Sequence, residues 1–299
     1  MIDLTRRNFI AAAGACTLAG RLSAKPLGLP IGSQTYPHRQ RIKDNDFPGL
    51  LNDMKALGIE SVELCCPAYA EFSSLSDGKQ TRTIIEDHGL KSVSAHFTMN
   101  SLRNQQPQMI EWAKQIGMTQ MATASLGGKV ENGMVSMDAV KRAADEYNKI
   151  ATEAAKAGLQ QVLHDEGFEL AKVEGDTRLS YEVLLELLDP KLVKMQFQMS
   201  AMRTVGDPIT YFTKYPGRFI SMHLQGVNLN APMPAPRPAP VPGAPPAGRG
   251  PAIPGVAVGK DSLDWKKIFA AAKTGGVQNY FVEQPWDLTV QSVEFLKTL

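Results

Sequence analysis

The sequence predicts a single (β/α)8 barrel, the TIM-barrel fold, over residues 25–299. Three observations lead to this fold class. Short apolar runs, typical of strands in a buried parallel sheet, alternate with longer segments whose apolar residues recur at helical spacing. Glycines such as Gly58, Gly117 and Gly158 follow the helical segments, as expected at helix C-termini. The alternation repeats eight times, which is the number of strands that closes such a barrel.

The expected strands are short, apolar and often β-branched. In chain order they are Leu29–Gln34, Ser61–Cys65, Lys91–Phe97, Gln120–Ala124, Val162–His164, Val193–Met199, Phe219–Leu224 and Gln278–Glu283.

A helix is expected after each strand, on the evidence of apolar residues three and four positions apart. Asp46 is the expected N-cap of the first helix, and Gly58 is expected to end it. The helices are predicted at Phe47–Leu57, Thr81–His88, the segment through Met109 and Trp112 up to Gly117, Met137–Ala157, Tyr181–Leu188, a short helix opened by Asp207-Pro208, Trp265–Ala272 and Leu288–Leu299.

Residues 1–24 have the pattern of a twin-arginine export signal and are not expected in the barrel. Arg6 and Arg7 precede a short run rich in alanine, and Leu22-Ser23-Ala24 offers a cleavage site before Lys25. The run is too short and too rich in glycine and alanine for a stable membrane span. A lipoprotein signal at Cys16 is a poorer match to the preceding residues. We therefore expect a periplasmic protein without stable membrane insertion.

The charge and cysteine content exclude two classes of protein. Residues 1–24 hold three arginines and one aspartate, so their loss takes the net charge from +2 to 0. A neutral domain lacks the basic surface expected of a nucleic-acid binder. The remaining cysteines, Cys65 and Cys66, are neighbours and cannot close a loop, so we expect buried thiols and no disulfide scaffold.

One segment departs from the alternating pattern. Residues 231–254 hold 10 of the chain's 20 prolines, mixed with alanine and glycine. Such a composition favours extended conformations and cannot build a core. We interpret residues 229–256 as a loop inserted after the seventh strand, on the rim of the barrel. A neutral spacer is the favoured interpretation; a lid or a protein-binding segment is the alternative.

Titratable residues collect at the predicted strand ends, where barrel enzymes carry their active sites. The fifth strand breaks into His164-Asp165-Glu166, and residues two apart share one face of a strand, so His164 and Glu166 are expected to point together. A histidine beside a carboxylate suits a divalent metal or a general base. The other strand-end candidates are His38, Glu63, His96, His223 and Glu283.

Five segments together resemble the sugar phosphate isomerase/epimerase family, which has a xylose isomerase-like TIM barrel. The resemblance runs from about residue 27 to the C-terminus and is specific to the family, not to one substrate. The segments are Ile31–Tyr36, Leu57–Leu64, Tyr215–Phe219, Val258–Trp265 and Tyr280–Gln284.

The resemblance implies a divalent metal, most often manganese, held by side chains of strands 5 to 8. The matching positions here are His164, Glu166, His223 and Glu283. The metal would polarise a sugar carbonyl while carboxylates move a proton on the adjacent carbon. Glu63, Glu166 and Glu283 are the catalytic candidates. The residues expected to contact the sugar are Tyr36, His38, Arg39, His96, Arg203 and Trp286.

Two positions depart from the family pattern. The family has a metal-binding aspartate at the end of strand 6, where this chain has Ser200, and serine is a poor ligand for a hard ion. The family often has Lys-Asp after the strand-7 histidine, where this chain has Gln225-Gly226. These departures predict a metal site that is altered, and weak or lost.

Three functions remain open. The first is an exported isomerase or epimerase acting on a free or glycosidic sugar, since sugar phosphates are cytoplasmic. The second is a lyase or hydrolase of 3-keto-glycosides, which shares the proton abstraction next to a carbonyl. The third is a catalytically silent barrel that binds a carbohydrate or a partner. An endonuclease is disfavoured by the neutral charge and by the absence of a multi-zinc ligand set.

Overall fold

The computed structural model describes residues 25–230 and 255–299. The predicted export signal and most of the predicted Pro-rich insertion lie outside these residues. In the part of the chain that the structure describes, no helix is long and apolar enough to cross a membrane.

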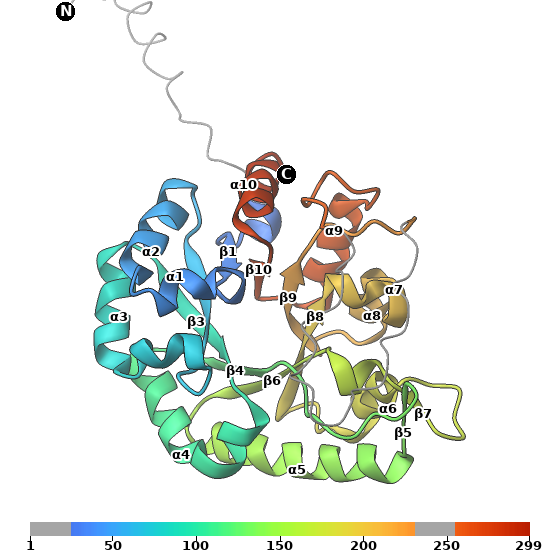
Figure 1. Ribbon diagram of the computed structural model, residues 1–299. Coiled ribbons are helices and arrows are strands. Elements are labelled where there is room, and N and C mark those ends of the chain that lie inside the picture. The colour runs from blue at the N-terminus through green and yellow to red at the C-terminus, as the bar shows by residue number, and fades with distance from the viewer. Residues whose placement is uncertain (1–24, 231–254) are drawn as a thin grey trace, which may run out of the picture.

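Eight strands pair in parallel and close into one barrel, with helices around the outside (Figure 1). The predicted (β/α)8 fold is therefore confirmed. The barrel strands are β1 Gly32–Gln34, β2 Ser61–Cys65, β3 Lys91–His96, β4 Gln120–Thr123, β6 Gln160–His164, β8 Val193–Gln198, β9 Phe219–Leu224 and β10 Asn279–Val282.

Ten helices are formed by the described residues, and most coincide with the predicted ones to within a few positions. They are α1 Arg39–Lys43, α2 Phe47–Ala56, α3 Gly78–Asp87, α4 Met99–Ile116, α5 Met137–Lys156, α6 Ser180–Leu187, α7 Met202–Val205, α8 Pro208–Lys214, α9 Trp265–Gly275 and α10 Trp286–Leu296.

The barrel closes where β1 pairs with both β2 and β10. The strand is short and begins at Gly32, where a Cβ atom would lie 2.5 Å from the carbonyl oxygen of Tyr280. Glycine therefore lets the two backbones approach closely enough to complete the ring. Cys65 and Cys66, at the end of β2, are free and buried, as expected.

Three local predictions differ from the structure. Asp46 stands at the N-cap of α2, but its side chain does not cap the helix and instead pairs with Arg41 at 2.6 Å. The helix before Gly117 begins as early as Met99, through an irregular Gln105. Strands β5 (Met134–Val135) and β7 (Lys172–Val173) form a separate two-stranded sheet. Strands of two residues carry too little periodicity to be predicted.

The two ends of the Pro-rich insertion are held together at the barrel rim. Gly226 and Val256 form an isolated antiparallel bridge, and the Val256 carbonyl accepts a hydrogen bond from Nε2 of Gln284 at 2.8 Å. The insertion therefore leaves the barrel and returns to it at one place, next to the end of β10.

Glu169 is a fully buried carboxyl group in η4, the 3-10 turn Gly167–Leu170 that follows β6. Its Oε1 accepts a hydrogen bond from the backbone N–H of Leu126 at 2.8 Å. Burial outweighs this contact and raises the pKa of Glu169 from 4.5 to about 8. The folded state thus holds the proton at pH values where the unfolded chain has released it.

We predict that Glu169 makes the fold less stable as pH rises from about 4.5 through 8, because the unfolded state then binds fewer protons than the folded state. Glu169→Gln keeps an acceptor for Leu126 and cannot ionise. The free energy of unfolding of the variant, relative to that of wild type, should therefore increase from pH 5 to pH 9, on the order of a few kcal/mol. Urea unfolding at both pH values measures this. Exposed Glu174→Gln is the control, and an equal wild-type-to-variant difference at both pH values would contradict the prediction.

Candidate active site at the barrel mouth

Five titratable side chains meet at the carboxyl ends of the barrel strands, where the sequence placed them. Glu63 lies on β2, and His96 and His164 are the last residues of β3 and β6. His223 lies on β9, and Glu283 follows β10 directly. Because all eight strands run the same way, their ends supply one shared mouth.

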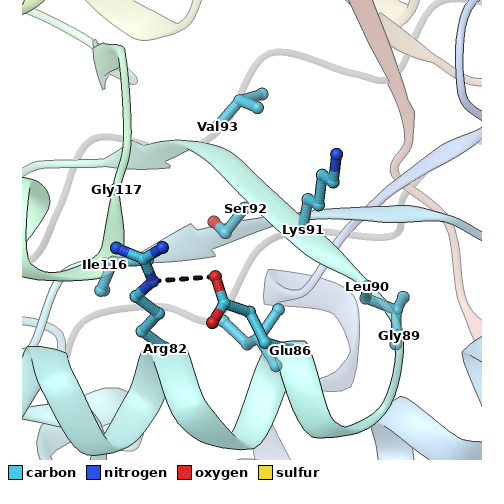
Figure 2. Close-up of a pocket in the computed structure, with 10 residues that line it drawn as sticks. Arg82, Glu86, Gly89, Leu90, Lys91, Ser92, Val93, Ile116 and Gly117 are labelled. Atoms are coloured by element: carbon cyan, nitrogen blue, oxygen red, sulfur yellow. Dashed lines mark hydrogen bonds and ion pairs between the residues drawn. The ribbon is translucent and has the colours of Figure 1, made fainter.

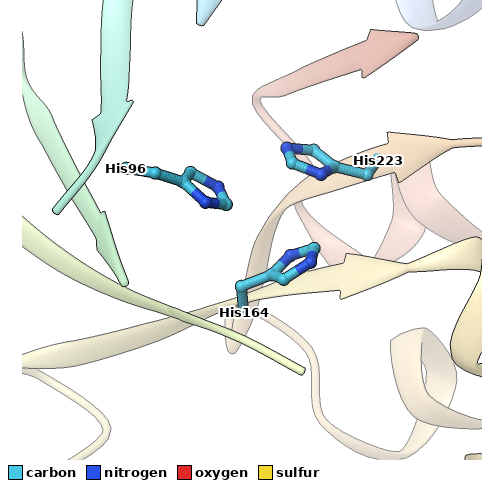
Figure 3. Close-up of side chains that lie close together, drawn as sticks. All are labelled: His96, His164 and His223. Carbon is cyan, nitrogen blue, oxygen red and sulfur yellow. The ribbon is translucent and has the colours of Figure 1, made fainter. Parts of the chain in front are cut away.

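The three histidines form a compact, buried cluster (Figure 3). The ring centroids of His164 and His223 are 4.7 Å apart, and each lies 5.2 Å from the ring of His96. One potential ligand atom from each ring lies within 4.8 Å of the other two. His164 Nδ1 has no hydrogen-bond partner among the described residues although it is buried. Such an orphaned nitrogen is typical of a site that accepts a ligand or an ion.

Glu63 lies beneath these rings and is fully buried. Its Oε2 lies 2.5 Å from Nε2 of His223 and 3.3 Å from Nε2 of His96. Its Oε1 accepts hydrogen bonds from the Ser94 hydroxyl at 2.8 Å and from the Gln196 amide at 3.0 Å. Glu63 is therefore buried with its lone pairs occupied, in the floor of the site and not on its surface.

Glu283 lies on the opposite side of His223. Its Oε2 is 3.2 Å from Nδ1 of His223, and it accepts amide hydrogen bonds from Gln198 at 2.6 Å and from Gln225 at 2.9 Å. Its side chain is 14% exposed, whereas that of Glu63 is 0% exposed. Of the two carboxylates that contact His223, only Glu283 therefore reaches the solvent side of the site.

Burial and the two carboxylates determine the charge of this array. Burial alone would lower the pKa of His223, but Glu63 and Glu283 outweigh it and raise the pKa to about 10. Burial would raise the pKa of Glu283, but His223 lowers it to about 2. The histidines likewise hold the pKa of Glu63 well below its usual range. The array is thus an imidazolium between two carboxylates.

His164 has the opposite charge state. Burial lowers its pKa well below the usual value, and the neighbouring rings of His223 and His96 lower it further. His164 therefore stays neutral, with a lone pair on one ring nitrogen. The cluster brings together a neutral imidazole and a charged one within a few ångströms.

Two adjoining cavities lie at the barrel mouth, and the inner one reaches the cluster. The inner one has a volume of about 70 Å³ and is bordered by His96, His164, Glu166 and Glu283. The outer one, about 600 Å³, shares Tyr36, Glu166 and Glu283 with the inner one and extends to the barrel rim. The inner cavity has room for an ion or about two waters. The outer cavity is within the size range of small-molecule sites.

The predicted substrate-contact residues separate into two groups. Tyr36 and Arg39 border the outer cavity, with the Arg39 guanidinium 4.4 Å from the centre of the Tyr36 ring. His38 and Trp286 instead pack edge to face against each other, and neither borders the two cavities. Burial lowers the pKa of His38 to about 4, in keeping with a packed, neutral ring. Arg203 lies on α7, away from both cavity walls.

The sixth strand of the barrel is β8. It carries glutamines near the position where the family pattern has an aspartate. Ser200 lies in the turn η5 (Met199–Ala201), exposed on the wall of the outer cavity. The side chain from this strand that bonds Glu283 is Gln198, and its own Oε1 is buried without a partner among the described residues. Two residues earlier, Gln196 bonds His96 at 2.9 Å.

Neither glutamine was predicted from the sequence as part of the site. The signal that could have found them is the period of two in a strand, which puts Gln196 and Gln198 on the face opposite to the apolar Met195 and Phe197. An amide side chain inside a barrel is not typical of any one function, so the position of these glutamines in the sequence did not indicate their role.

A third cavity lies at the opposite end of the barrel. It is bordered by α3, the start of β3 and Gly117, and its polar side chains include the ion pair of Arg82 and Glu86 at 2.8 Å (Figure 2). The ends of the strands that open here are the amino ends. Residues at this end of such barrels usually serve stability, so the mouth is the candidate site.

Comparison with solved structures identifies the fold. A sugar phosphate isomerase/epimerase from Parabacteroides distasonis superposes with a TM-score of 0.69 at 18% identity, over 91% of this chain and 96% of its own. A xylose isomerase-like TIM barrel protein from Mycobacterium smegmatis, in complex with magnesium, gives 0.62 at 14% identity, over 92% and 97%. The chain has the fold of the xylose isomerase-like TIM barrels.

The same fold carries other activities. A family 2 AP endonuclease from Brucella melitensis superposes with a TM-score of 0.56 at 12% identity, over 89% of this chain and 98% of its own. No protein-family model matches the sequence, and no curated protein is similar to it. Fold alone therefore leaves the reaction open, and the site residues have to decide it.

We predict that Glu63→Gln destabilises the fold strongly, because it removes the buried negative charge between two histidines and presents an amide N–H to His223. Loss of one partner from a buried pair costs about 3–5 kcal/mol. Urea unfolding measures this loss. The control is Glu60→Gln near the other end of the same strand, where a partly exposed pair with Lys25 contributes about 1 kcal/mol or less. A loss for Glu63→Gln no larger than that of the control would show the array to be dispensable.

Proposed function

We propose that this chain is an enzyme that moves a proton on the carbon next to a carbonyl of a sugar or keto-sugar. The observation that carries the proposal is the pair of carboxylates, Glu166 and Glu283, bordering the same inner cavity above His96 and His164. A carbon-bound proton next to a carbonyl needs a base beside it and charge stabilisation at the oxygen. Both requirements have candidate groups on this cavity wall.

The two carboxylates differ in basicity. With a pKa of about 2, Glu283 stays ionised but is a weak base. We therefore assign the proton transfer to Glu166, which borders both cavities from the segment after β6. Glu283 holds a fixed negative charge that orients His223 and the two glutamine amides. Glu63, buried below the rings, acts as a positioning residue in this scheme.

The chain's donor set fits a divalent ion of the kind that the fold implies. Two buried acceptors, His164 Nδ1 and Gln198 Oε1, have no partner among the described residues. His223 and the ionised Glu283 lie beside them. Histidines of this cluster would hold the ion, with Glu283 and Glu166 beside it on the cavity wall. When bound, the ion would polarise the carbonyl oxygen of the substrate.

A lyase or hydrolase of 3-keto-glycosides is the second candidate. It uses the same proton abstraction, followed by departure of the group on the neighbouring carbon. The volume of the outer cavity, about 600 Å³, favours it because a glycoside carries a leaving group beyond the sugar ring. The glutamines and Ser200 on strand 6 are the features that would instead suit a silent binding barrel.

The first test is hydrogen exchange in D₂O, followed by proton NMR on free sugars, glycosides and their 3-keto forms, with and without Mn²⁺. We expect loss of the signal of the proton next to the carbonyl, with isomerisation, epimerisation or elimination as the net reaction. Glu166→Gln should slow exchange about 10²–10⁴-fold. Glu283→Gln should abolish it while the unfolding transition is kept, since this group lies at the mouth and not in the core.

Glu174→Gln, an exposed change that borders neither the inner nor the outer cavity, is the matched control for exchange. Protein that is folded but exchanges no substrate proton under any of these conditions would contradict the proposed function and favour a silent barrel. A Glu283→Gln variant that unfolds would show that this group is structural.

We also propose that the protein works in the periplasm after export through the twin-arginine pathway. Arg6 and Arg7 carry this proposal. Changing both to lysine should keep the chain, with residues 1–24 still attached, in the cytoplasm. Cell fractionation and mass spectrometry of the N-terminus measure this. Periplasmic protein that is processed equally well in the double variant would contradict the assignment.

A further inference from the structure

We propose that three imidazoles, those of His96, His164 and His223, hold the ion, so that the site selects a nitrogen-seeking divalent metal such as Zn²⁺ or Co²⁺ over Mn²⁺ or Mg²⁺. The inference rests on the divalent centre of the proposed function and specifies its ligands and its metal class. It gives His96 a role as a ligand, where the sequence predicted a sugar contact.

The geometry of the three rings is the first support. Each ring offers a ligand atom, and these atoms lie within 4.8 Å of one another. Ligands of one tetrahedral ion with bonds near 2.0–2.1 Å lie about 3.4 Å apart, so rotations of the side chains can close the set onto an ion. His96 and His164 are also the two histidines that border the inner cavity, which leaves a side of the ion open to substrate.

The groups around the rings are the second support. Metal-binding histidines typically have their other nitrogen held by a carboxylate or carbonyl, which fixes the ring orientation. Here Gln196 Oε1 contacts Nε2 of His96 at 2.9 Å, and Glu63 Oε2 contacts Nε2 of His223 at 2.5 Å. Glu63 and Gln196 are themselves joined at 3.0 Å. The two rings are therefore oriented by one buried network. Nδ1 of His223, which lies 3.2 Å from Glu283, would release its proton and become the ligand atom when an ion binds.

The loss of oxygen ligands is the third support. Mn²⁺ and Mg²⁺ prefer carboxylates, carbonyls and water, whereas imidazole suits Zn²⁺, Co²⁺ and their neighbours. Strand 6 offers Gln196 and Gln198 at this depth, and Ser200 lies exposed in the outer wall. Glu283 already accepts two glutamine amides on Oε2. Three imidazoles therefore face two carboxylates, Glu166 and Glu283, at the inner cavity.

The test is titration of metal-depleted, full-length protein with Co²⁺, Zn²⁺ and Mn²⁺. Elemental analysis after dialysis gives the stoichiometry, the visible spectrum of bound Co²⁺ reports nitrogen ligation, and thermal unfolding reports stabilisation. We expect one bound ion per chain, a higher affinity for Co²⁺ and Zn²⁺ than for Mn²⁺, and a higher Tm with the ion bound. His96→Ala and His164→Ala should each weaken Co²⁺ binding at least 100-fold.

His88→Ala is the matched control, since that ring ends α3 and lies outside the cluster. If His96→Ala does not fold, His96→Asn keeps a polar side chain and answers the same question. Co²⁺ affinity unchanged in a folded His96 variant would overturn the three-imidazole set, as would tighter binding of Mn²⁺ than Co²⁺. No binding of any ion would overturn the inference altogether.

The outcomes separate this inference from the proposed function. Proton exchange on a keto-sugar by protein that binds no metal would overturn the inference and leave the function standing. Binding of one ion per chain through His96, without proton exchange on any sugar tested, would support the inference and contradict the proposed function.

Discussion

The barrel mouth depends on an imidazolium placed between two carboxylates, one fully buried and one at the cavity wall. Burying Glu63 and Glu283 without a counter-charge would cost several kcal/mol for each ion. His223 lies between them and is charged by both, as its pKa of about 10 reflects. The remaining lone pairs of Glu63 are occupied by neutral donors from β3 and β8. The buried part of this network, Glu63 with His223, Ser94 and Gln196, is therefore stable only with its partners in place.

The parallel barrel makes such a network possible because it aligns the ends of distant strands. Glu63 and His223 are 160 residues apart in the chain, yet their side chains are in contact. Successive residues of a strand also point to opposite faces, so neighbours have different surroundings. His164 points to the cluster, while Asp165 accepts a hydrogen bond from the backbone N–H of Gln198. Burial raises the pKa of Asp165 well above its usual range, so this second acid belongs to the wall and not to the array.

The sequence was sufficient to predict the fold and the strand ends because both follow from local periodicity. The last residue of β6 and the whole of β9 could be located in this way, and with them His164 and His223. What each group does depends on depth and on partners from other strands. Nothing local distinguishes buried Glu63 from Glu283 at the cavity, or shows that His38 packs on Trp286. The glutamines of β8 were missed for the same reason, since an amide acquires a role only from the charges that surround it.

The bridge between Gly226 and Val256 makes the stability of the barrel nearly independent of the length of the Pro-rich insertion. Because Gly226 and Val256 are joined, a change in the length of chain between them changes the entropy of closing the loop. That entropy grows only with the logarithm of length, about 0.6 kcal/mol for each doubling. Such a junction lets an insertion grow, shrink or change composition over evolution at little thermodynamic cost. It also makes this position of the barrel suitable for grafting a foreign segment beside the active site.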